Sequence, residues 1–168
     1  MQIPKIIELD KVEAIEEINS GLFQQTLDFA LEDHPRSWKA AWLLNQVVSK
    51  YSSDIKTNDI RICKSIPEKR SNQQRELLRL LENVEITSNN EGYIFDAALS
   101  CWEDLKAQSA TRMVGFRLML KIATKHKELL QEVENLMEER YLKGLSPGIK
   151  NAVKKRMFKA IASSQDAE

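Results

Sequence analysis

Trp42-Leu43-Leu44-Asn45-Gln46-Val47 is the stretch that the rest of this chain repeats. After the tryptophan, two adjacent apolar residues are followed by two polar or variable residues and another apolar one. Three later stretches match this pattern, at 80–84 (LLENV), 118–122 (LMLKI) and 157–161 (MFKAI). The first apolar residues stand at 43, 80, 118 and 157, so successive copies are 37, 38 and 39 residues apart. A fixed period of roughly 20 to 50 residues is typical of repeat architectures, so the sequence predicts a repeat protein.

Capping residues, prolines and apolar spacing predict about nine helices joined by short turns, with no strand. The expected helices cover residues 10–21, 22–31, 35–49, 54–66, 71–84, 91–105, 109–125, 127–142 and 147–162. Asp10 and Ser71 each begin a capping box, Gly21 ends the first helix, and Pro67 stops the fourth. Each hairpin is apolar on more than one side and must stack on its neighbours. We therefore expect one domain over 1–168, ordered over about 10–162.

The period, the paired helices and the recurring apolar pattern resemble the HEAT-like and armadillo-like helical repeats. This resemblance implies an all-α fold, a right-handed α-α superhelix of about four HEAT-like hairpins. It also implies a non-catalytic protein-interaction or scaffold module. The chain departs from many such repeats, which carry a fixed Asp and Arg. Here Arg79, Arg117 and Arg156 recur at the position that Trp42 holds in the first copy, without a matching row of Asp.

In such repeats the second helix of each hairpin lines the concave face, so the resemblance places the binding surface on 54–66, 91–105 and 127–142. A helix turns about 100° per residue, so the face opposite each apolar stripe can be assigned. The candidate binding residues on those faces are Thr57, Arg61, Lys64, Asp96, Ser100, Glu103, Glu128, Glu132, Asn135 and Glu139. The later two faces are acidic, so we expect a protein partner that presents basic residues to them.

The charge balance argues against a dedicated nucleic-acid binder. Lys and Arg total 25 and so do Asp and Glu, whereas such binders usually carry a basic excess. The charge is segregated, with a balance of −6 over residues 1–33 and +4 over residues 143–168. We interpret these segments as solvated ends of the stack, and an end-specific partner contact is the alternative.

Other classes of site lack the residues that they need. No stretch is long and apolar enough for a signal peptide or a membrane span. Cys63 and Cys101 have no metal or redox spacing and are expected to be buried thiols in a reducing compartment. His34 and His126 each lack a second ligand three or four residues away, so neither a metal nor a cofactor is predicted. We expect a monomeric cytoplasmic protein.

Two enzyme classes are the alternatives. DNA-alkylation-repeat glycosylases are built from HEAT-like hairpins and use Trp and Asp in a DNA-binding groove, which Trp102-Glu103-Asp104 resembles. The stretch 66–72 (IPEKRSN) is similar to Ser-Ser-x-Met-Pro-x-Lys-x-Asn, the signature of the fumarase and adenylosuccinate-lyase superfamily. Ile66 replaces its Met and Asn72 lies one residue late. Both stretches also have a structural interpretation. Trp102 packs in the core, and Pro67 stops one helix before the next begins.

The apolar pattern also predicts the core. We expect these residues to be mostly buried: Leu44, Leu81, Leu99, Trp102, Phe116, Leu120 and Phe158. Trp38 and Trp42 lie on the apolar face of the third helix and are expected to join them.

Overall fold

The computed structural model describes residues 3–165, and no strand occurs within that range. Its α-helices are α1 Lys11–Glu17, α2 Ser20–Ala30, α3 Ser37–Val47, α4 Ser52–Ser65, α5 Ser71–Leu81, α6 Glu91–Glu103, α7 Ser109–Ala123, α8 Lys127–Asn135, α9 Glu139–Leu142 and α10 Pro147–Gln165. Three short 3₁₀ helices join them: η1 Lys5–Ile7, η2 Val48–Lys50 and η3 Ile66–Glu68.

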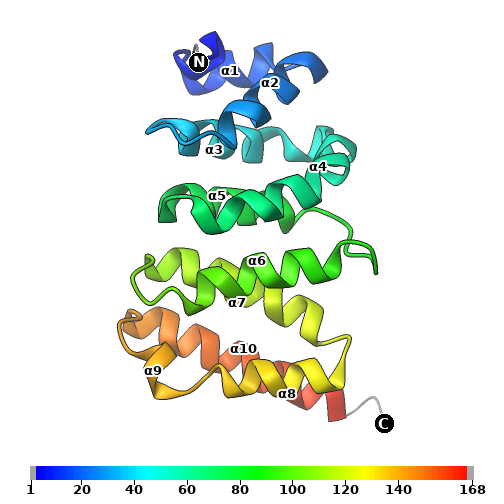
Figure 1. Cartoon of the computed structure of the whole chain (residues 1–168), viewed down its shortest axis with the longest axis vertical. Coiled ribbons are helices and arrows are strands. Elements are labelled where there is room, and N and C mark those ends of the chain that lie inside the picture. The colour runs from blue at the N-terminus through cyan, green and yellow to red at the C-terminus, as the bar shows by residue number, and fades with distance from the viewer. Residues whose placement is uncertain (1–2, 166–168) are drawn as a thin grey trace.

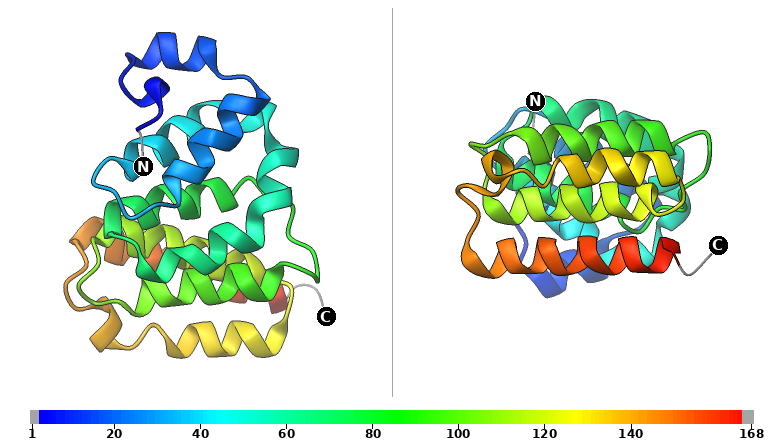
Figure 2. Two further views of the ribbon diagram at one scale, coloured as in Figure 1. Left: turned by 45° about the horizontal axis from the view of Figure 1, so that its top comes forward. Right: turned by 90° about the horizontal axis from the view of Figure 1, so that it is seen from below.

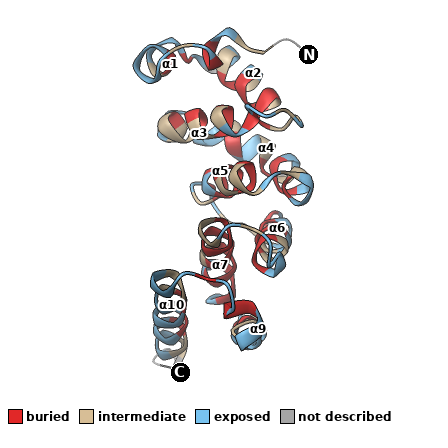
Figure 3. Ribbon diagram, turned by 90° about the vertical axis from the view of Figure 1, so that its left-hand side faces the viewer, coloured by how far each residue is buried: buried red, intermediate tan, exposed pale blue. Residues whose placement is uncertain are grey.

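The helices stack in two layers along the long axis of the molecule (Figure 1). One layer contains α3, α5, α7 and α10, each packed on the next, and Figure 2 shows α10 running beside α7. The other layer contains α4, α6, α8 and α9, and α4 packs on α6. Buried residues face the space between the layers (Figure 3). The predicted all-α superhelix of about four hairpins is confirmed.

Hydrogen bonds between repeats join residues about one period apart in sequence. Gln73 Nε2 donates to the Ala30 carbonyl at 2.7 Å, and the two residues are 43 apart. The Ser71 hydroxyl donates to Thr111 Oγ1 at 2.9 Å across 40 residues. Buried polar groups need partners, so these bonds favour one register of each repeat on the next.

α6 and α7 form the most closely packed antiparallel pair. Gly115 permits the approach, because a Cβ at that position would lie 2.6 Å from the Ala98 carbonyl oxygen. The predicted hairpins end near residue 105 and begin again at 109, so this tightest contact crosses a predicted hairpin boundary. Close packing therefore links successive hairpins as firmly as it links the helices within one.

The predicted roles of Gly21 and Ser71 at helix ends differ from the structure. Asp10 does cap α1, accepting from the amides of Val12 and Glu13 at 2.8 and 3.0 Å. However, α1 ends at Glu17, and Asn19 caps α2 through the Leu22 amide at 3.1 Å, so Gly21 lies inside a helix. At the second site, Ser71 does not cap α5, because its hydroxyl bonds across the repeat boundary instead.

The single helix predicted over 127–142 is divided into α8 and α9. Trp102 Nε1 donates to the Leu136 carbonyl at 3.0 Å, and this carbonyl would otherwise accept the i+4 bond of a continuous helix. Buried Arg112 donates to the Trp102 carbonyl at 2.9 Å and to the Tyr141 carbonyl at 2.5 Å. Its guanidinium thus satisfies carbonyls at the ends of α6 and α9. These tertiary bonds hold the α8–α9 turn.

Most of the predicted core is buried, with two clear exceptions. Leu44, Leu81, Phe116, Leu120 and Trp102 are buried, whereas Leu99 and Trp42 are partly buried. The prediction for Phe158 is wrong, because its exposed fraction is 76%. Met157 is buried instead, and α10 has no further helix beyond it within residues 3–165. Trp38 is also exposed, at 37%.

Candidate functional site

The predicted binding residues of α4 contact neighbouring helices. Thr57, Arg61 and Lys64 are exposed on α4. Arg61 forms an ion pair with Asp28 of α2 at 2.6 Å, and the Lys64 ammonium lies 5.4 Å from the centre of the Tyr93 ring. Their charges are therefore partly engaged within the molecule, and α4 contributes to none of the grooves described below.

The predicted residues of α6 and α9 lie on the same layer but do not converge. Asp96 and Glu103 are exposed, and Ser100 is partly buried with its hydroxyl bonded to the Ala97 carbonyl at 2.8 Å. Glu139 lies beyond the break between α8 and α9, where it pairs with Lys150 at 3.4 Å. Asn135 is exposed at the last residue of α8. The placement of these faces on a concave surface stays a prediction.

The structure does bring Glu128 and Glu132 together in a groove of about 380 Å³ between α6 and α8. We call it the acidic groove, and its lining residues are Glu91, Gly92, Phe95, Ile122, His126, Glu128, Leu129 and Glu132. Glu91 Oε2 lies 3.2 Å from His126 Nε2. The groove combines carboxylates with an apolar surface, an arrangement suited to a cationic and partly apolar ligand.

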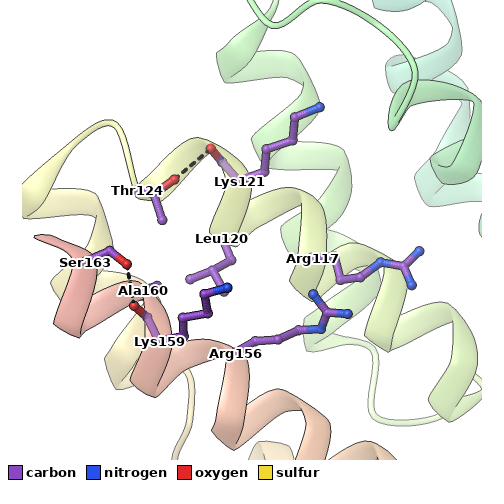
Figure 4. A pocket seen from close by; sticks show the side chains of 8 residues that line it. All are labelled: Arg117, Leu120, Lys121, Thr124, Arg156, Lys159, Ala160 and Ser163. Atoms are coloured by element: carbon purple, nitrogen blue, oxygen red, sulfur yellow. Dashed lines mark hydrogen bonds between the residues drawn. The ribbon is translucent and has the colours of Figure 1, made fainter.

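A second groove, which the sequence analysis missed, lies between α7 and α10 and has a volume of about 310 Å³. We call it the basic groove, and its lining residues are Arg117, Leu120, Lys121, Thr124, Arg156, Lys159, Ala160 and Ser163. Figure 4 shows the four cationic side chains rising from the two helices around Leu120. Two features of the sequence indicated positive charge in this region: the recurring arginines at 117 and 156, and the basic balance of residues 143–168.

Arg117 is anchored from the preceding repeat. Its Nε and Nη2 atoms each donate to the Glu82 carboxylate at 2.8 Å, a two-point pair of the kind that arginine geometry favours. Lys121 Nζ donates to the Glu82 carbonyl at 3.3 Å. By contrast, neither Arg156 nor Lys159 forms an ion pair within residues 3–165. The basic groove thus has one anchored wall and, on α10, two cations without a carboxylate partner among residues 3–165.

The residues that would carry enzyme chemistry have structural roles. Trp102 is fully buried against Phe116 and donates its indole N–H to Leu136, so it is not available to stack on a nucleic-acid base. Asn72 of the lyase-like stretch accepts from the Gln73 amide at 2.9 Å and lines none of the grooves described here. The glycosylase interpretation therefore loses the aromatic side chain on which it depended.

The two thiols are poor nucleophiles. Burial raises the pKa of Cys63 to about 12, with the Asp59 charge adding to the effect, and burial likewise raises the pKa of Cys101 to about 12. Both are free, and a thiol reacts as the thiolate, which at these pKa values is scarce near neutral pH. Within residues 3–165, no group of three or more His, Cys, Asp or Glu side chains could hold a metal ion.

The comparison with known families decides the relationship of this chain. A family model described as a HEAT repeat domain matches residues 5–161. The chain belongs to the HEAT repeat family. This HEAT repeat protein is an all-helical repeat protein, and none of its helices within residues 3–165 has both the length and the apolarity to cross a membrane. A search of curated proteins and a search of solved structures each found no match.

Proposed function

We propose that this HEAT repeat protein is a non-catalytic interaction module that binds a basic segment of a protein partner in the acidic groove. The observation that supports the proposal is the convergence of Glu91, Glu128 and Glu132 around Phe95 and Leu129. A solvated acidic helix face alone would not bring carboxylates and apolar side chains from two helices into one groove. We keep the predictions of a monomer and of a cytoplasmic location as part of this proposal.

The spacing of the carboxylates indicates the form of the ligand. Glu128 and Glu132 are four residues apart on α8, which is about 6 Å along the helix axis. Basic residues one turn apart on a helix, or alternate residues of an extended strand, have a similar spacing. An apolar side chain between them would rest on Phe95 and Leu129. Exposed charges act mainly on the association rate, so binding should weaken at higher salt.

The test uses a labelled peptide of about 15 residues with Lys at i and i+4 and Leu on the same face. Fluorescence anisotropy would measure its affinity for the protein and for the double variant Glu128→Lys/Glu132→Lys. We expect the variant to bind about tenfold more weakly or worse.

The matched control is Glu13→Lys/Glu16→Lys, which makes the same change in net charge on exposed positions of α1. It should leave the affinity unchanged, and circular dichroism should show native helix content for both variants. Equal weakening by the two variants, or no saturable binding to the unaltered protein, would show that the acidic groove is not the binding site.

A further inference from the structure

The basic groove concentrates positive charge on the layer opposite the acidic groove. Arg117 and Lys121 lie one turn apart on α7, and Arg156 and Lys159 line the facing wall on α10 (Figure 4). Within residues 3–165 no acidic residue lines the groove, and Glu82 pairs with Arg117 from outside its lining. A cleft lined by charges of one sign focuses the electrostatic potential and attracts the opposite charge.

The groove continues beyond these four side chains. A neighbouring cavity of about 300 Å³ shares Thr124, Ala160 and Ser163 with it, and adds Lys125, Lys127, Leu130 and Ser164 to the lining. Among the described residues 3–165, its lining is also without an acidic side chain. Together the two cavities follow the C-terminal half of α10 along α7. An elongated, positively charged surface of this kind suits a segment of chain better than a single small anion.

The floor of the groove places a second requirement on the ligand, in addition to negative charge. Leu120 and Ala160 are apolar, and both are largely buried beneath the charged side chains. The hydroxyls of Thr124 and Ser163 already donate to the carbonyls of Lys121 and Lys159, at 3.1 and 3.0 Å (Figure 4). The ligand must therefore bring negative charge for the walls and an aliphatic group for the floor.

We propose that the basic groove binds an acidic segment of a protein, with an aliphatic side chain seated on Leu120 and Ala160. Carboxylates one helical turn apart would meet Arg156 and Lys159, which are three residues and about 4.5 Å apart along the axis of α10. A nucleic acid is less well suited, because no aromatic side chain within residues 3–165 lines the two cavities, so a base would have nothing there to stack on. This site is independent of the acidic groove, since the two share no residue.

The test uses the full chain and a labelled peptide of about 15 residues with Glu at i and i+4 and Leu between them on the same face. A second peptide replaces every Glu by Gln, and a single-stranded oligonucleotide of similar charge serves as a competitor. The reporter variant is Arg156→Glu/Lys159→Glu, which reverses the two cations on α10. We expect micromolar binding of the acidic peptide, weakened about tenfold or more by this variant and lost in the Gln peptide.

The control variant is Lys154→Glu/Lys155→Glu, on the same helix with the same charge change but outside the groove. It should bind the acidic peptide as the unaltered protein does. Four results would overturn the proposal: no saturable binding, equal weakening by the control, equal binding of the Gln peptide, or tighter binding of the oligonucleotide. Circular dichroism confirms that each variant is folded before its affinity is compared.

Discussion

The acidic and basic grooves differ in how firmly their walls are held. The α7 wall of the basic groove belongs to a 15-residue helix whose residues are mostly buried, and Glu82 fixes Arg117 in place. The α8 wall of the acidic groove is a 9-residue helix that stops where Trp102 binds the Leu136 carbonyl. Less buried apolar surface supports α8, so we expect it to open locally more often. The basic groove is the better preformed of the two, and the acidic groove is the more adaptable.

The largest effect expected from this comparison comes from Arg112→Met. The change leaves the carbonyls of Trp102 and Tyr141 without their donor, and unsatisfied buried groups typically cost 1–3 kcal/mol each. We expect the free energy of unfolding to fall by about 3 kcal/mol. Hydrogen exchange should accelerate in α8 and α9 more than in α5. Equal acceleration of exchange in all helices would show that the helices around the acidic groove are no less stable than the rest of the stack.

An intermediate effect should follow from Gly115→Ala, which acts on both grooves. α6 lines the acidic groove and α7 lines both, so separating these two helices should disturb each site. The added methyl group meets the Ala98 carbonyl, and overpacking of this kind costs about 1–3 kcal/mol. Urea unfolding would measure the loss. Gly148→Ala is the control, because nothing lies within 4 Å of its Cβ position. If Gly148→Ala lowers the free energy of unfolding by the same amount, a steric clash does not explain the effect at Gly115.

The smallest effect should come from Glu82→Gln, which releases the anchored wall of the basic groove. The pair with Arg117 is about two-thirds buried on both sides, so its loss should cost about 1 kcal/mol. Thermal unfolding would report the change. Glu85→Gln breaks the largely exposed pair with Lys56 and should leave the midpoint unchanged. If Glu82→Gln is equally neutral, Arg117 needs no anchor and the two grooves do not differ as described.

The sequence predicted the fold, and two of its ten candidate binding residues line the acidic groove. The apolar period, the Asp10 cap and most helix positions are confirmed, because they depend on interactions within a helix or on burial of a regular stripe. Glu128 and Glu132 were assigned correctly to one exposed face of a helix. Ser71 was misassigned, because its hydroxyl has a better-placed partner in Thr111, which is 40 residues away. Side-chain partners across a repeat boundary are not visible in local spacing.

The sequence by itself determined the repeat. It specified a period near 38 residues, helices that alternate between two layers, and an acidic first and a basic last segment. Tertiary structure alone decided which charges meet. Packing of α10 beside α7 places Arg156 and Lys159 opposite Arg117 and Lys121, and the Trp102 bond to Leu136 divides the last predicted second helix. The physical reason is that periodicity specifies which face of a helix is buried, whereas a groove depends on which two exposed faces lie side by side.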